Sequence, residues 1–243
     1  MQSSKADIIS RLQKEILPLQ GFKTGAPHPC KDIGLGPIKY AFPGNVFPQG
    51  AIHEFIVPGQ IEIAPTCGFI SALLSSFKNC KGITLWISAS RQLFPPALKF
   101  FGIDPDNVFF IDLANEKEVL WTLEEALKCE GLLAVIGETK DLDFTSSRRL
   151  QLAVETSGVT GFIIRKNTKT LTTTACIARW RICSSASELP GDMPGVGFPA
   201  WHIELLKVRN GKPGSWYYEW KNGKLEHLSR IDDPVEHLQK KTG

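Results

Sequence analysis

Short apolar runs separated by helical patterns dominate the chain up to Arg165. Runs of this length between amphipathic helices are typical of βαβ units, in which parallel strands are buried on both faces. The sequence therefore predicts an α/β fold with a mostly parallel sheet and helices on both faces. The predicted strands are AIHEFIV from Ala51, ITLWIS from Ile83, VFFID from Val108, LLAVIG from Leu132 and GFIIR from Gly161.

Three segments carry apolar residues at helical spacing. Glu116 to Cys129 forms one stripe, and Ser146 to Ser157 begins with hydroxyl side chains that are expected to cap a helix. Lys5 to Leu17 forms the third, and a Gly- and Pro-rich stretch follows it. This first helix forms either an arm apart from the sheet or a helix folded back onto its own domain. Its candidate partner-binding face contains Ile8, Leu12 and Ile16.

After Arg165 the pattern changes to alternating strands, joined by turn signals at Asn210-Gly211 and Asn222-Gly223. The sheet is therefore expected to end in antiparallel strands, and the tryptophans at positions 180, 201, 216 and 220 are expected to pack within them. The predicted organisation is an N-terminal helix and linker arm (1–48), a core domain (49–231) and a flexible tail (232–243).

Composition narrows the class of protein. Hydrophobic residues make up 42% and charged residues 22% of the 243 residues, which is typical of globular proteins, and a net charge of +3 does not by itself indicate nucleic-acid binding. The six cysteines contain no CxxC pair and the five histidines lack metal-ligand spacing, so no metal or other cofactor is predicted. Without a signal peptide or an apolar span, we expect a cytoplasmic protein and no membrane partner.

The stretch from Phe47 to Ser76 has the order strand, loop, helix, which is where a phosphate-binding loop would lie. Aligning Gly68 with the second glycine of GxxxxGK[ST] puts Phe69 at the lysine and Ile70 at the metal-binding hydroxyl. We therefore predict a degenerate phosphate loop that binds no nucleotide. It is either a simple strand-to-helix connection with Phe69 packed into the core, or a weak anion site formed by the backbone amides near Thr66 to Gly68. Its residues are Ala64, Pro65, Thr66, Cys67, Gly68, Phe69 and Ile70.

The sequence resembles the RecA recombinase core from about Gly44 to Leu228, through FPQGAIHEF, TLWISASRQLFPPALKFFGIDPDNV and GSWYYEWKNGKL. It is more closely similar to the ImuA family in the set GAIHE, FPPAL, EEALKC, SRRLQLA, TGFIIR, ARWRI and ELLKVRNGKPGSWYYEW. The resemblance implies an accessory role in SOS-induced error-prone translesion synthesis. The implied partners are an ImuB-like protein related to Y-family polymerases, an error-prone replicative-type DNA polymerase and RecA.

The resemblance also places the groups that ATP hydrolysis would need. The water-activating carboxylate falls on Ser90, and the metal-binding aspartate falls on Gly137, with Glu138 expected on the opposite face of the strand. The side chains before Arg165 that would include a polar sensor are apolar. Because several independent elements are missing, we predict no conventional ATPase.

A set of basic residues is the candidate contact for single-stranded DNA or for an acidic partner. The Arg148-Arg149 pair opposes the helix dipole if it lies in the first turn of its helix, so helix propensity does not explain it. Solvated charges and structural ion pairs are the alternative interpretation. The set contains Arg148, Arg149, Arg165, Lys166, Lys169, Arg179 and Arg181.

The altered phosphate loop and the family resemblance leave three hypotheses about function. The first is a non-catalytic, RecA-like scaffold of translesion synthesis. The second is an inhibitor of cell division that binds the tubulin-like division GTPase, as the related SulA proteins do. The third is an atypical ATPase that regulates RecA. The full-length core and the preserved terminal hairpin favour the first over the second.

Overall fold

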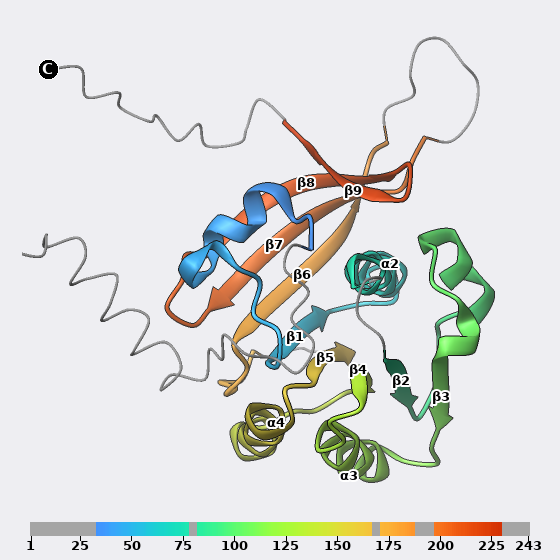
Figure 1. Ribbon diagram of the computed structural model, residues 1–243, viewed down its shortest axis with the longest axis vertical. Helices are drawn as coiled ribbons and strands as arrows, with labels where there is room; N and C mark the ends of the chain where they lie inside the picture. The colour runs from blue at the N-terminus through green and yellow to red at the C-terminus, as the bar shows by residue number, and fades with distance from the viewer. Residues whose placement is uncertain (1–32, 78–81, 167–170, 188–196, 230–243) are drawn as a thin grey trace, which may run out of the picture.

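The computed structural model describes residues 33–77, 82–166, 171–187 and 197–229, which form a nine-stranded sheet flanked by helices (Figure 1). The strand order is β3-β2-β4-β5-β1-β6-β7-β8-β9. The strands are β1 (Ile52–Val57), β2 (Ile83–Ser88), β3 (Val108–Asp112), β4 (Leu132–Thr139), β5 (Thr160–Lys166), β6 (Ala178–Ser185), β7 (Ala200–Val208), β8 (Gly214–Lys221) and β9 (Lys224–Leu228). The predicted α/β class, consistent with a RecA-like core, is confirmed.

The sheet has a parallel half and an antiparallel half that meet at β6. Every pairing from β3 to β6 is parallel, and every pairing from β6 to β9 is antiparallel. The antiparallel strands predicted at the C-terminal edge are present, but β6 also extends the parallel half because it pairs in parallel with β1. In the turn between β8 and β9, Asn222 and Gly223 both have positive φ, as a two-residue hairpin turn requires.

Helices cover both faces of the parallel half (Figure 1). One face carries α2 (Ile63–Ser76), and the other carries α3 (Glu116–Leu127) and α4 (Phe144–Ser157). None of the helices in the described ranges is long and apolar enough to span a membrane. Short 3-10 segments complete the fold: η1 (Gly36–Ala41), η2 (Pro43–Asn45), η3 (Pro95–Phe101) and η4 (Pro105–Asn107). The predicted N-terminal helix, with Ile8, Leu12 and Ile16, and the predicted tail lie outside the described residues.

The start of α4 differs from the predicted start. Asp143 is the N-cap, and its carboxylate accepts a hydrogen bond from the amide of Ser146 at 2.6 Å. The helix therefore begins before the serines that were expected to cap it. Arg148 and Arg149 consequently lie in the second turn of α4, where the dipole argument against them is weak because the effect is confined to the first turn.

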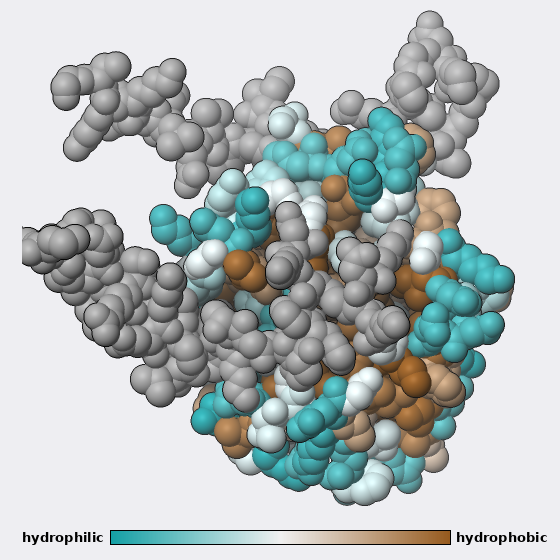
Figure 2. Space-filling model, in the orientation of Figure 1, coloured by the Kyte–Doolittle hydropathy of each residue, from teal (hydrophilic) through white to brown (hydrophobic). Residues whose placement is uncertain are grey.

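Apolar side chains divide into a core on each face and a small surface patch. Trp180, Trp201 and Trp220 are buried on the α2 face, and Trp216 is partly buried against the same core, so the predicted packing of the four tryptophans within the antiparallel strands is confirmed. Hydrophobic residues also gather at the surface over β2 and β3 (Figure 2), where Ile83 and Phe109 are exposed. This patch arises because β3 is the last strand of its edge and α3 lies mainly over β4 and β2.

His53 of β1 is fully buried next to Phe47, whose ring stacks on the imidazole with centroids 4.4 Å apart. Nε2 lies 2.7 Å from the carbonyl oxygen of Pro48, and Nδ1 accepts a hydrogen bond from the indole of Trp180 at 3.3 Å. These two contacts require the neutral tautomer with hydrogen on Nε2. Burial lowers the pKa of His53 from 6.5 to about 4.

This lowered pKa predicts that acid destabilises the fold through His53. Between pH 6.5 and about 4 the unfolded chain binds a proton that folded His53 does not bind. The stabilisation is therefore complete above pH 6.5 and is lost as the pH falls, by up to about 3 kcal/mol. Urea unfolding of the wild type and His53→Gln across this range measures the difference, with half-buried His202→Gln as the control. Equal pH slopes in wild type and His53→Gln would contradict the assignment.

Candidate functional site

The predicted phosphate loop is helical. β1 ends at Val57 and α2 begins at Ile63, so Ala64 to Ile70 all lie within the first turns of α2 rather than in a loop. The amide of Thr66 donates to the carbonyl of Glu62 at 3.1 Å, and the hydroxyl of Thr66 bonds to the same oxygen at 2.6 Å. The expected loop conformation is therefore wrong. The first glycine of the motif would lie at position 63, which is Ile63 in this chain. Pro65 is well tolerated in the first turn of a helix, so α2 can begin at Ile63.

Phe69 fills the space behind β1. It is fully buried, and its ring lies 6.1 Å from Trp180 and 6.3 Å from Trp201, measured between ring centroids. A Cβ atom on Gly68 would lie 3.1 Å from the ring of Trp201, so the glycine lets α2 approach β7 closely. Both residues of the apparent motif thus serve packing between α2 and the sheet.

A polar cluster of three buried side chains and the exposed Ser90 lies at the carboxyl ends of β2, β4 and β5. The ammonium of Lys166 is 2.9 Å from the carboxylate of Glu138 and also donates to the carbonyl and hydroxyl oxygens of Ser90, each at 3.1 Å. The second carboxylate oxygen of Glu138 accepts a hydrogen bond from the indole of Trp86 at 2.6 Å. We call Trp86, Ser90, Glu138 and Lys166 the edge cluster. In open α/β sheets ligands bind at this end of the strands.

The edge cluster corrects the expected roles of Gly137 and Glu138. A Cβ atom on Gly137 would lie 2.4 Å from the side chain of Leu123 in α3, so position 137 faces α3 and has no room for an acidic side chain. Glu138 instead lies on the α2 face, where burial, with Glu138 nearby, raises the pKa of the Cys67 thiol to about 12. Gly137 and Glu138 lie on opposite faces of β4, as predicted from strand alternation. The residue that faces α2, however, is Glu138 and not residue 137.

Lys166 already neutralises Glu138 within the protein. The side chains of both residues are almost completely buried, and a buried charge needs a partner of opposite sign. The hydroxyl of Ser88, next to Glu138 across the strand pair, is buried without a hydrogen-bond partner. Among the described residues, no three His, Cys, Asp or Glu side chains are grouped closely enough to hold a metal ion.

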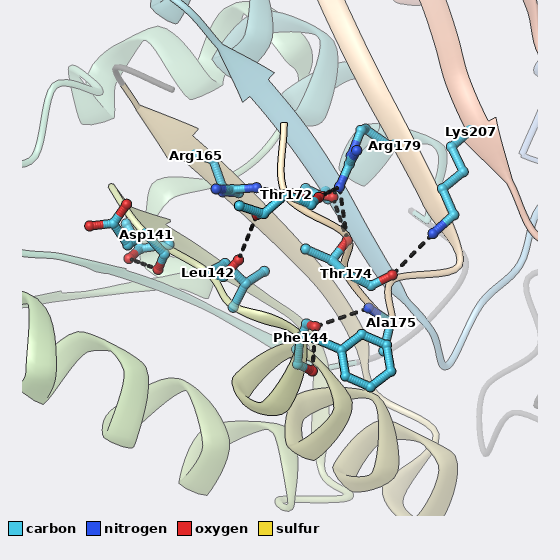
Figure 3. Close-up of polar contacts among 12 residues, drawn as sticks. Asp141, Leu142, Phe144, Arg165, Thr172, Thr174, Ala175, Arg179 and Lys207 are labelled. Carbon is cyan, nitrogen blue, oxygen red and sulfur yellow. Dashed lines mark hydrogen bonds and ion pairs between the residues drawn. The ribbon is translucent and has the colours of Figure 1, made fainter. Parts of the chain in front are cut away.

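A second buried network lies around Glu54 of β1, on the face of the sheet opposite α2. Its carboxylate accepts hydrogen bonds from Arg165 at 2.7 Å, Arg179 at 2.8 Å and the hydroxyl of Thr174 at 2.7 Å. Figure 3 shows how Arg179 also reaches the backbone at Thr172, whose own hydroxyl bonds to Leu142. The network fixes residues 172–174 against the sheet.

The predicted basic set is therefore divided. Arg165, Lys166 and Arg179 are buried in ion pairs with Glu54 and Glu138, so they do not offer their charge to a ligand at the surface. Arg149 pairs with Glu124, and Arg181 lies 3.8 Å from Glu204. Arg148 is exposed, and Lys169 lies outside the described residues. No continuous basic strip forms in the described part of the chain.

Sequence reasoning missed Glu54 and Trp86, which complete these networks. Glu54 had a signal, because it is a charged residue inside the apolar run AIHEFIV. A carboxylate buried in a strand is almost always paired with a cation, so the sequence indicates a basic partner for Glu54. Trp86 had no comparable signal, since a tryptophan in a buried strand needs no special explanation.

Comparison with known proteins finds two curated relatives of this chain. No protein-family model matches the chain. The chain is 32% identical over 206 residues to Protein ImuA of Caulobacter vibrioides strain NA1000 / CB15N, which covers 79% of this chain and 84% of that protein. Protein ImuA of Caulobacter vibrioides strain ATCC 19089 / CIP 103742 / CB 15 gives the same identity and coverage.

The edge cluster generates a stability prediction. Glu138→Gln leaves the buried ammonium of Lys166 without a carboxylate and should lower the free energy of unfolding by about 3 to 5 kcal/mol. The double variant Glu138→Gln/Lys166→Met removes both charges and should recover most of that loss. Urea titration followed by circular dichroism measures both.

Glu125→Gln, which removes an exposed partner of Lys128, is the control and should change little. A Glu138→Gln variant as stable as this control would contradict the buried pairing.

Proposed function

This chain belongs to the ImuA family, and from that membership we propose that it is a non-catalytic, RecA-like accessory protein of SOS-induced error-prone translesion DNA synthesis. It acts through protein partners rather than through turnover of a nucleotide. The observation that carries the proposal is the pairing of Glu138 with Lys166 at the end of the sheet where a nucleotide and its metal ion would bind.

Several elements of ATP hydrolysis are replaced by packing or by internal pairs. The loop amides are taken up in α2, Phe69 is a core residue, and Glu138 on the α2 face of β4 is paired with Lys166. Each electrostatic element of such a site is worth orders of magnitude in rate, so the loss of several together supports a protein without conventional turnover.

The proposed partners are the ImuB-like protein related to Y-family polymerases and the error-prone replicative-type polymerase, with RecA as a third candidate. The segment with Ile8, Leu12 and Ile16 is the candidate partner helix. Weak binding of single-stranded DNA would depend on Arg148 and Arg149, the two exposed arginines of α4. Because only these two members of the basic set are in the exposed class among the described residues, we expect protein contacts to dominate.

The proposal predicts that nucleotide does not stabilise the protein. ATP at about 5 mM with Mg²⁺ should leave the melting temperature unchanged within about 1 °C, because a ligand that binds only weakly adds little free energy to the folded state. Differential scanning fluorimetry measures the shift, with RecA recombinase as the positive control. A Mg²⁺-dependent shift that saturates at micromolar ATP would favour the atypical ATPase instead.

The proposal also predicts association with polymerases in damaged cells. Tagged full-length protein should retain the ImuB-like protein and the error-prone polymerase, and a variant lacking Met1 to Leu19 should retain less of them. Quantitative mass spectrometry after DNA damage measures both. Absence of these partners from both samples removes the main support for the scaffold. Filamentation on overexpression, with unchanged damage-induced mutation, would favour the division inhibitor.

A further inference from the structure

A groove of about 240 Å³ lies between α3 and α4, the two helices that run over the same face of the sheet (Figure 1). Its walls include Leu120 and Trp121 of α3 and Leu150 of α4. Charged side chains border this apolar surface: Lys117 and Glu124 from α3 and Arg149 from α4. The lining residues of α3 recur at helical spacing, so one continuous stripe of the helix faces the groove.

Trp121 is not explained by the packing of this chain. The face of α3 that packs against the sheet contains Val119, Leu123 and Leu127, whereas Trp121 lies on roughly the opposite side of the helix and is 65% exposed. Trp86, Trp180, Trp201 and Trp220 are buried. Exposed tryptophans and arginines are the residue types most enriched among the dominant contacts of protein interfaces.

The charges of the groove favour an acidic occupant. Glu124 is its only carboxylate among the described residues, and it is already paired with Arg149 and with Lys128, the latter at 3.4 Å. The side chain of Arg149 remains 61% exposed in that pair, and Lys117 has an exposed side chain at the other end. An approaching carboxylate therefore meets two accessible cations, while the carboxylate already present is shielded by its own pairs.

The size of the groove favours side chains of a peptide over a cofactor. Small-molecule sites typically measure about 300 to 1,000 Å³, which is larger than this groove. A groove between two helices that combines apolar walls with charged rims is the usual receptor for an amphipathic helix. We propose that the groove binds an acidic amphipathic helix of a partner protein, with an aliphatic or aromatic anchor against Trp121 and a carboxylate against Arg149.

This interface extends the proposed scaffold function, on which its biological role rests, by naming a surface and a partner chemistry. It is distinct from the N-terminal segment, whose residues from Lys5 to Leu17 carry three cations and two carboxylates and so do not supply an acidic helix. Direct peptide binding tests the groove, and co-purification tests the scaffold. Each can therefore fail without the other.

The experiment uses the full-length chain and two fluorescein-labelled helical peptides. Both peptides carry leucine at i, i+4 and i+7, and their flanking positions hold glutamate in one peptide and lysine in the other. Fluorescence anisotropy should show at least tenfold tighter binding of the glutamate peptide. Trp121→Ser should abolish binding of the glutamate peptide with little change in melting temperature, because the side chain is largely exposed.

Charge reversal supplies the decisive comparison. Arg149→Glu should weaken the glutamate peptide at least tenfold and strengthen the lysine peptide. Arg148→Glu makes the same change one residue away, outside the groove lining, and should alter binding less than threefold. Equal effects of the two variants would overturn the proposal, because a diffuse charge effect would then explain the binding. So would binding that persists in Trp121→Ser.

Two other occupants have defined outcomes. Oligo(dT) that displaces the glutamate peptide from the wild type but not from Arg148→Glu would assign the site to nucleic acid and overturn the proposal. A chain truncated after Ser229 that binds the glutamate peptide much more tightly than full-length protein would show that the chain's own acidic segment, Asp232 to Glu236, fills the groove. That result would overturn the assignment to a different protein.

Discussion

The carboxylates buried in the parallel half of the sheet have to be neutralised inside the protein. Glu138 and Glu54 are both buried, and leaving either charge alone would cost about 3 to 5 kcal/mol, a large share of the stability of a typical domain. Lys166 and Arg165, neighbours in sequence, satisfy one carboxylate each, on opposite faces of β5. The final residues of one strand therefore determine the electrostatics of both faces.

This neutralisation gives the carboxyl edge of the sheet a different character from that of a nucleotide site. A working site holds unsatisfied donors and acids ready for phosphate and metal. Here the amides are used in α2, the acid is paired with lysine, and the lysine is further held by Ser90. The edge keeps the topology that positions ligands, while its charges are satisfied by the chain itself.

The fold could be predicted from the sequence because apolar runs and helical stripes are local signals. The five parallel strands and the start of α3 at Glu116 follow from them directly. The start of α2 could not be predicted, because alignment to a loop motif assumed a loop where a helix begins at Ile63.

The roles of the charged residues in the site could not be predicted from local patterns either. Arg179 was a candidate contact for DNA or a partner, with a structural ion pair as the alternative. The ion pair is what forms, but its partner Glu54 is 125 residues away in sequence and meets Arg179 only after the sheet forms. The exposure of Trp121 had a usable signal, since it lies off the apolar stripe of α3.

The position of β1 also determines when this fold can form. β1 is the first strand of the sheet to be synthesised, and its two neighbours are β5 and β6, so Ile52 pairs with Gly161 and His53 with Ala178. Contacts of such long sequence separation slow folding, because loop closure has to precede the gain in stability. During synthesis, β1 therefore cannot pair with its neighbours, and Glu54 cannot pair with Arg165 and Arg179, until most of the chain has been made. Until then the apolar side chains of β1 lack their partners in the sheet, and unpaired strand edges of this kind favour aggregation.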